Sequence, residues 1–162
     1  KIRQLKEYGQ TKKYHHDSIG FNSRLDTLQA AVLNFKLQQL DDWNKKRQDL
    51  AGIYRTMLRI IPDVLLPNSY QNRKSVYHLF VIRTKQRDEL QQYLLKKNIL
   101  TQIHYPFPIH LQKAWRFLKY KPGDFPIAET LSKEMLSLPM FPELTDRQVR
   151  YVCISIMNFF YS

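Results

Sequence analysis

The sequence is poor in cysteine and glycine and contains no long apolar run. Its single cysteine, Cys153, excludes an internal disulfide and leaves a zinc centre without further sulfur ligands. The four glycines stand far apart, at positions 9, 20, 52 and 123, which excludes a glycine-rich phosphate loop. No apolar run approaches the roughly 20 residues that span a bilayer, and the amino end has no signal-peptide pattern. We therefore predict a cytoplasmic chain with no metal site and no membrane partner.

What the sequence does contain is enough apolar surface for a core. Of its 162 residues, 43% are hydrophobic and 13% are aromatic, which suffices for one core of ordinary domain size. Residues 2–8 resemble the last turns of a helix that Gly9 closes with a left-handed cap. A native protein would hardly begin there, so we expect further residues upstream of Lys1.

Basic residues exceed acidic ones, and the formal net charge is +12. The densest basic group, residues 45–47, is answered by Asp41, Asp42 and Asp49, and the other basic residues are spread over several expected helices. This placement argues against nucleic acid as a partner. Solvated helix faces and pairing with an acidic missing part both remain open as explanations of the charge.

Helical periodicity dominates the first part of the chain. Apolar residues recur at helical spacing from Arg24 to Phe35 and again from Trp43 to Ile61, which predicts one very long helix or two in series. Ser23 and Asp26 resemble a capping box at its start, and Pro62 marks its end. We therefore divide the chain into a helical arm, residues 1–62, and a small α+β domain, residues 63–162.

The second part of the chain alternates strand and helix signals. Residues 76–82 predict a strand covered on both faces, residues 88–97 a helix that Asn98 stops, and residues 99–104 a second strand. A stiff proline-containing loop at 105–108, a helix at 126–136 and a short segment at 137–140 follow. Thr145 and Gln148 form a capping box for the last helix, which would bury Cys153. The fold class is α+β, with a small antiparallel or mixed sheet packed on helices.

Candidate chemistry is sparse. The sequence has no nucleophile elbow and no H-E-x-x-H helix, and its five histidines lack metal-ligand spacing. His104, Tyr105 and His110 stand on or beside the stiff loop and are candidates for hydrogen bonding in a cleft. Ordinary packing of that loop is the alternative for all three residues.

Several motifs, in order, resemble the DegT/DnrJ/EryC1/StrS family of sugar aminotransferases, and they cover essentially the whole chain. They are KYHH at 13–16, IGFNSRLD at 19–26, LQAA at 28–31, LDDWN at 40–44 with Arg47, YHLFVIR at 77–83, HYP at 104–106 with HLQ at 110–112, GDFP at 123–126 with Ala128 and Glu129, and LSLPM at 136–140.

The resemblance implies that this chain is the C-terminal portion of a pyridoxal-phosphate-dependent enzyme with the large α/β domain absent. In the family that domain carries the lysine that binds the cofactor covalently, so we assign no catalytic residue here. The complete enzyme would move an amino group from an amino acid, with glutamate expected, to a nucleotide-linked ketosugar, with dTDP expected as the carrier. A sugar dehydratase of the same family and a non-catalytic docking or dimerisation domain are the alternatives.

The family pattern also implies roles for single residues. Asn22 would contact the cofactor phosphate of the neighbouring subunit in a homodimer, and Arg24 is a weaker candidate for an anionic ligand. Capping of the following helix is the alternative for Asn22. Tyr14 and His16 would border the site, while His104, Tyr105 and His110 would shape the sugar or nucleotide pocket.

Overall fold

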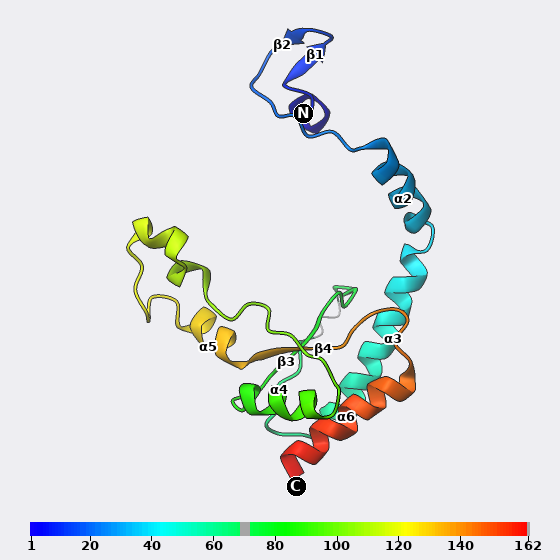
Figure 1. Ribbon diagram of the computed structural model, residues 1–162, viewed down its shortest axis with the longest axis vertical. Helices are drawn as coiled ribbons and strands as arrows, with labels where there is room; N and C mark the ends of the chain where they lie inside the picture. The colour runs from blue at the N-terminus through cyan, green and yellow to red at the C-terminus, as the bar shows by residue number, and fades with distance from the viewer. Residues whose placement is uncertain (69–71, 162) are drawn as a thin grey trace. The chain divides into compact units, whose positions relative to one another are not determined.

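The computed structural model describes residues 1–68 and 72–161, and its contacts divide the chain into two units, Lys1–Asp41 and Asp42–Ser162 (Figure 1). From the sequence we expected the division at residue 62. The helix that contains Asp41 buries Leu50, Tyr54 and Leu58 in the core of the second unit.

The first unit is built from short elements. Helix α1 (Ile2–Leu5) precedes an antiparallel pair of strands, β1 (Gln10–Lys12) and β2 (His15–His16), and helix α2 (Thr27–Leu37) follows. Helix α1 ends before Tyr8, where the sequence placed its end, and the Gly9 N–H donates to Gln4 O at 2.9 Å. Gly9 has a φ of +76°, and a Cβ atom there would lie 1.7 Å from Ser18 O. Only glycine fits this turn.

The long helical stretch is two helices in series, one of the two forms that the periodicity left open. Helix α2 ends at Leu37 and helix α3 (Leu40–Leu58) begins three residues later, with its end well before Pro62. The expected capping box at Ser23 is wrong. Asp26 itself is the N-cap residue of α2, and its carboxylate accepts from the N–H groups of Leu28 at 2.9 Å and Gln29 at 3.2 Å.

The sheet of the second unit has a two-stranded antiparallel centre. Strand β3 (Phe80–Arg83) pairs with β4 (Met135–Leu138), with Phe80 opposite Leu138 and Ile82 opposite Leu136. Single bridges, Leu65 to Arg83 and Gln102 to Ser137, extend this sheet on its two sides. The described residues thus have the α+β class that the sequence predicted.

The strand predictions were partly wrong. Strand β3 begins at Phe80 rather than at residue 76, because Tyr77 has a φ of +49° and leaves the extended conformation. Only one face of β3 is fully buried, since Phe80 and Ile82 are buried while Val81 is half-buried. Of the expected strand at 99–104 only the bridge at Gln102 forms, and strand β4 was taken for an irregular segment.

The helices of the second unit follow their predictions more closely. After α3 they are α4 (Arg87–Lys96), α5 (Pro126–Glu134) and α6 (Asp146–Tyr161), with the short 3₁₀ helices η1 (Ile109–Leu111) and η2 (Lys113–Leu118) between α4 and α5. Asn98 stops the α4 segment with a φ of +59°, as expected. The capping box of α6 is confirmed, because Thr145 N donates to Gln148 Oε1 at 2.9 Å and Gln148 N to Thr145 Oγ1 at 3.3 Å.

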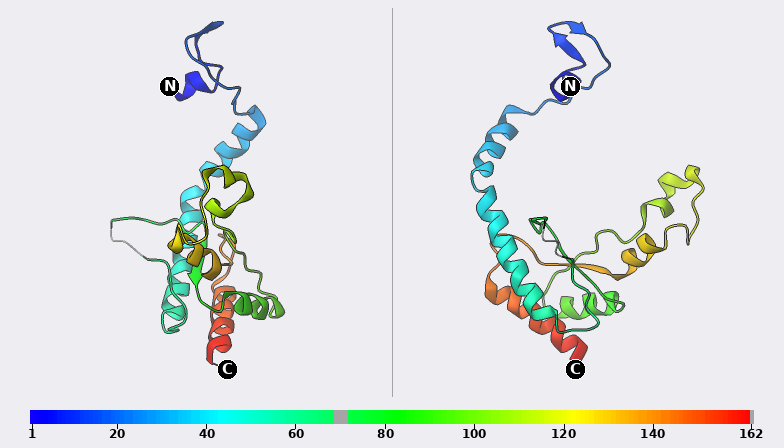
Figure 2. Two further views of the ribbon diagram at one scale, coloured as in Figure 1. Left: turned by 90° about the vertical axis from the view of Figure 1, so that its left-hand side faces the viewer. Right: turned by 180° about the vertical axis from the view of Figure 1, so that it is seen from behind.

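The core of the second unit lies between the sheet and helices α3, α4 and α6. Helices α4 and α6 run side by side next to the sheet (Figure 2). The ring of Tyr54 on α3 stacks on Phe80 of β3 at 4.8 Å, and its hydroxyl donates to Pro139 O at 2.9 Å. Cys153 is buried in this core, as predicted, and burial raises the pKa of its thiol to about 12. A thiol in this setting is inert packing.

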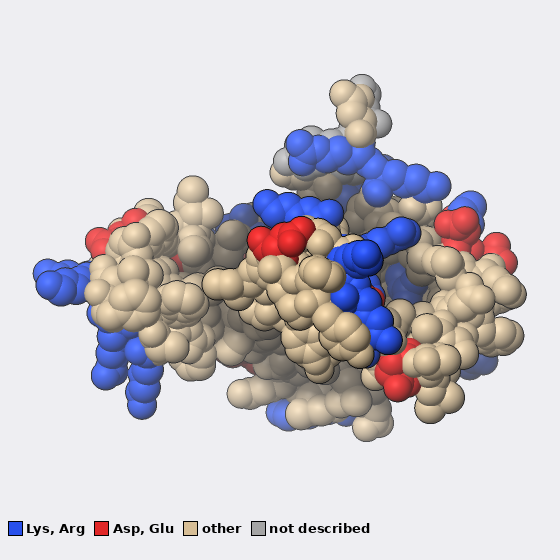
Figure 3. Space-filling view, turned by 90° about the horizontal axis from the view of Figure 1, so that it is seen from above, with Lys and Arg blue, Asp and Glu red and all other residues tan. Residues whose placement is uncertain are grey.

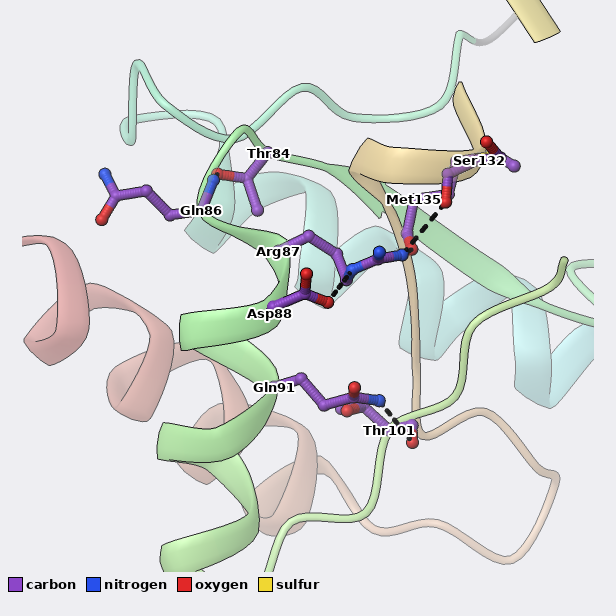
Figure 4. A network of polar contacts seen from close by, with 8 residues as sticks. All are labelled: Thr84, Gln86, Arg87, Asp88, Gln91, Thr101, Ser132 and Met135. Atoms are coloured by element: carbon purple, nitrogen blue, oxygen red, sulfur yellow. Dashed lines mark hydrogen bonds and ion pairs between the residues drawn. The ribbon is translucent and has the colours of Figure 1, made fainter. Parts of the chain in front are cut away.

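Two arginines, Arg83 at the end of β3 and Arg87 at the start of α4, hold the junction between α5 and β4. Figure 4 shows the buried Arg87, whose Nη1 donates to Ser132 O at 3.2 Å and to Met135 O at 3.4 Å. Arg83 pairs with Glu134 through Nε at 3.2 Å and Nη2 at 2.8 Å. Together the contacts hold Ser132 and Glu134 of α5 and Met135, the first residue of β4, so they fix the start of this strand.

Candidate functional site

The sequence-predicted site residues of the first unit lie on exposed loops. Asn22 forms a bridge with Glu7, and the residues beside it are held by main-chain bonds, Phe21 N to Leu5 O at 2.7 Å and Ser23 N to Lys6 O at 2.9 Å. Within the described residues the Asn22 side chain has no hydrogen-bond partner. Since Asp26 caps α2, helix capping does not explain Asn22.

Tyr8 links Asn22's segment to the strand that carries His16. The Tyr8 N–H donates to Phe21 O at 3.0 Å, and the Tyr8 carbonyl accepts from His16 Nδ1 at 2.9 Å. A carbonyl can only accept, so the bond puts a proton on Nδ1 of His16. The short strand pair and the Asn22 segment are thereby joined within this unit.

Tyr14 and Arg24 are exposed in the same unit. Tyr14 has a φ of +68°, its N–H donates to Gln10 Oε1 at 3.1 Å, and the ammonium of Lys13 lies 5.2 Å from its ring centre. The Arg24 guanidinium has no partner in the described part of the chain. Asn22 and Arg24 are therefore available donors two residues apart.

In the second unit, His104 lines a pocket, and Tyr105 contacts the imidazole of His104. This His104 pocket has a volume of about 750 Å³, and its lining includes Asn98, Gln102, Met140 and Tyr151. His104 Nδ1 lies 2.9 Å from Ser137 Oγ, and the Tyr105 ring stands edge-on to the imidazole with the ring centres 5.9 Å apart. The structure thus brings two of the three predicted pocket residues together.

His110 lies elsewhere, in a smaller apolar pocket of about 410 Å³ lined by Trp115, Tyr120 and Phe125. Its Nε2 pairs with Glu129 Oε1 at 3.1 Å, and the same oxygen accepts from Gly123 N at 2.8 Å and from Phe125 N at 3.4 Å. The Gly123 N–H is the main cause that lowers the pKa of the Glu129 carboxyl, and His110 adds to the effect. His110 therefore holds its own loop, and it does not share the His104 pocket.

Two residues that contact these histidines, Glu129 and Ser137, were not singled out from the sequence for a role. Glu129 appeared only inside a family motif, and Ser137 only inside the segment at 136–140. Neither could have been found from local pattern, because Glu129 meets His110 from 19 positions away and Ser137 meets His104 from 33 positions away.

The described residues contain no group of three His, Cys, Asp or Glu residues that could hold a metal ion. None of the helices in the described ranges is both long and apolar enough to cross a bilayer. On the face drawn in Figure 3, basic side chains stand in several separate groups, with acidic residues between them.

The fold matches that of solved crystal structures. The crystal structure of DesV from S. venezuelae superimposes with a TM-score of 0.95 at 39% identity, covering 99% of this chain and 43% of that one. An aminotransferase structure from Brucella abortus gives a TM-score of 0.89 at 33% identity, again over 99% of this chain and 43% of that one. The fold is therefore that of part of a sugar-aminotransferase-like protein.

The DegT/DnrJ/EryC1/StrS aminotransferase family matches residues 1–157, and the chain belongs to this family. The erythromycin biosynthesis sensory transduction protein EryC1 of Saccharopolyspora erythraea is 46% identical over 156 residues, which are 96% of this chain and 43% of that protein. A dTDP-3-amino-3,4,6-trideoxy-alpha-D-glucose transaminase from Streptomyces venezuelae is 42% identical over 144 residues, 89% of this chain and 38% of that protein.

The chain thus spans less than half the length of the relatives that it matches. The aminotransferases of this family depend on pyridoxal phosphate, and a related structure, NtdA from Bacillus subtilis at 26% identity and a TM-score of 0.86, holds the cofactor as PMP.

Proposed function

We propose that this chain is the C-terminal portion of a pyridoxal-phosphate-dependent aminotransferase that transfers an amino group from an amino acid to a nucleotide-linked ketosugar. The observation that carries this proposal is the 42% identity to the dTDP-sugar transaminase of Streptomyces venezuelae. Two relatives whose names specify UDP-linked sugars are less similar, at 37% and 34%. We therefore propose dTDP as the carrier, and glutamate as the donor.

The first unit offers donors that fit the cofactor phosphate. The Asn22 amide has no partner in the described residues and is not needed to cap α2, and Arg24 is equally available. An amide N–H and a guanidinium both donate to phosphate oxygens, the latter with charge assistance. When bound, the cofactor supplies the electron sink for amino transfer, while these residues hold its phosphate.

The second unit supplies the substrate contacts. His104 lines the His104 pocket, and Tyr105, whose ring contacts the imidazole, is 75% exposed. We propose that they donate to and orient the sugar, while Tyr14 and His16 border the cofactor site. We also propose a homodimer, because the large apolar residues of α2, including Leu28, Val32 and Phe35, are exposed in the single chain.

A direct test is to mix the isolated chain with pyridoxal phosphate, reduce with borohydride and map any modified lysine by mass spectrometry. We expect no single modified lysine and no transamination, because no lysine here stands in the family's cofactor-binding context. Stoichiometric modification of one lysine together with turnover would show that this chain is catalytic by itself and would overturn the proposal of a missing catalytic part.

The phosphate contact is tested in the complete protein that carries this chain. We expect Asn22→Ala to weaken pyridoxal phosphate binding by about tenfold or more, since it removes a hydrogen bond to a charged group. Asn22→Asp should weaken it further by placing a carboxylate against the phosphate. Asn34→Ala, a change at an exposed asparagine of α2, is the matched control. Unchanged cofactor affinity in Asn22→Ala would remove Asn22 from the site.

A further inference from the structure

Ser137 of β4 is held rigidly by the sheet. It is only 4% exposed, it stands opposite Val81 of β3, and both of its main-chain groups are used. Its N–H donates to Gln102 O at 2.7 Å, and its carbonyl accepts from Gln102 N at 3.1 Å. The arginine contacts at the start of β4 fix the same strand two residues earlier. The hydroxyl is the one polar group of Ser137 that these bonds leave over.

The direction of the bond between Ser137 and His104 follows from the donors and acceptors that are present. Ser137 Oγ lies 2.9 Å from His104 Nδ1, and in residues 1–68 and 72–161 the hydroxyl has no other hydrogen-bond partner. A buried hydroxyl proton without an acceptor is costly, and an unprotonated imidazole nitrogen is an acceptor. The hydroxyl therefore donates to Nδ1, and the neutral ring carries its own proton on Nε2.

The Nε2 atom is the end of His104 that can meet a ligand. It has no partner within the described residues, and the imidazole is part of the lining of the His104 pocket. The Tyr105 ring packs edge-on against the imidazole, which adds a second constraint on ring orientation. An N–H at Nε2 recognises an acceptor, such as a keto, hydroxyl or phosphate oxygen, and it does not recognise an ammonium or amide donor.

We infer that Ser137 is a positioning residue: its hydroxyl holds neutral His104 in the Nε2–H tautomer and directs this N–H into the His104 pocket, to an acceptor oxygen of the sugar substrate. The identity of the ligand rests on the proposed function. The tautomer and its dependence on Ser137 rest on the geometry of this chain alone.

The tautomer is read by nitrogen NMR on the full chain labelled with ¹⁵N-histidine, at alkaline pH where imidazoles are neutral. His104→Gln identifies the signals of His104. We expect the wild-type chain to show a protonated Nε2 and an unprotonated Nδ1 for this residue. A wild-type spectrum with the proton on Nδ1 overturns the inference, whatever the variants do.

Three variants test the role of the hydroxyl. In Ser137→Ala we expect the single tautomer to give way to a mixture, and in Ser137→Thr, which keeps a hydroxyl, we expect the Nε2–H form to return. Ser155→Ala is the matched control, because Ser155 is also 4% exposed but lies on α6. It should leave the His104 signals unchanged. An unaltered tautomer in a folded Ser137→Ala chain contradicts the positioning role.

Steady-state kinetics on the complete protein test the ligand. We expect Ser137→Ala to raise KM for the nucleotide-linked ketosugar about threefold to tenfold, the range of one hydrogen bond, with KM for the amino donor unchanged. An unchanged sugar KM, despite a lost tautomer, would overturn the assignment of this N–H to the substrate. A wild-type protein without transamination would instead overturn the proposed function, and the NMR result would still decide the role of Ser137.

Discussion

Different interactions stabilise the interior of each of the two units of this chain. In the second unit, Tyr54, Phe80 and Leu90 are wholly buried in a common core. In residues 1–41, Gly9 is the only buried residue, while Leu28 and Phe35 are 76% and 70% exposed. Main-chain bonds and a helix cap order the first unit, and apolar burial orders the second. Exposed apolar surface of this extent is characteristic of an interface, so the first unit is built to be covered.

We expect the largest difference between the two units in the free energy of unfolding when one phenylalanine in each unit is replaced by alanine. Phe80→Ala deletes a buried ring that Tyr54 stacks on, and we expect it to lower the free energy of unfolding by about 3–5 kcal/mol. Phe35→Ala deletes a mostly exposed ring of α2 and should change it by less than about 0.5 kcal/mol in the single chain. Denaturant unfolding of the two variants measures both values.

A large loss of stability in the monomeric Phe35→Ala chain would break this comparison, because it would mean that α2 is packed within the chain. A large loss that appears only as protein concentration rises, with association, would instead sharpen it. Sedimentation velocity alongside the unfolding curves separates the two cases.

A smaller difference in stability is expected when one glycine in each unit, Gly9 or Gly123, is replaced by alanine. Both need a positive φ, +76° at Gly9 and +96° at Gly123, but a Cβ atom clashes only at Gly9. We expect Gly123→Ala to cost about 1–2 kcal/mol from backbone strain, and Gly9→Ala to cost more because Ser18 must also move. Hydrogen exchange of the main-chain amides at Tyr8 and Phe21 reports the Gly9 effect. Equal effects in the two variants would show that the turn at Gly9 yields freely.

The smallest expected effect is the pH-dependent stabilisation, by Glu129, of the loop that carries His110. The pKa of Glu129 is lowered in the folded chain, so its carboxylate stabilises the loop above the unfolded value, about 4.3 for glutamate. That contribution is lost as the pH falls through the lower folded pKa. Protection of residues 110–125 from proteolysis should therefore be greater in wild type than in Glu129→Gln at neutral pH, and the difference should vanish in acid.

Glu143→Gln is the control for this last prediction, because Glu143 is exposed on another loop. It should behave as wild type at every pH. If Glu129→Gln resists proteolysis as well as wild type at neutral pH, the hydrogen bonds to Glu129 do not hold the loop.

Local signals in the sequence were sufficient for the helices of the second unit. The capping box at Thr145 and the stop at Asn98 depend on residues within one turn, and both are present as expected. Strand β4 was missed because its four residues follow α5 directly, and none of them is a residue type that marks the end of a helix or the start of a strand. What makes them a strand is pairing with β3, which lies more than 50 positions earlier.

In the candidate site, too, local sequence predicts some features, while others depend on contacts between residues distant in sequence. Asn22 and His104 could be proposed from motifs that are contiguous in sequence. That Asn22 is not the N-cap of α2 required knowing that Asp26 caps this helix, and the partner of His104 required the register of the sheet. The expectation that His110 joins His104 in one pocket came from their closeness in sequence, and the contact with Glu129 separates them.

The contact between His110 and Glu129 has a consequence for how this protein can change. It ties together two positions 19 residues apart, so the aromatic loop between them is closed at its base. The entropy of closing a flexible loop grows only slowly with its length. Residues at the loop tip can therefore be exchanged, inserted or lost with little effect on the register that places Ser137 against His104. The contact between His110 and Glu129 thus separates the tolerance of the loop to change from the stability of the strand pair.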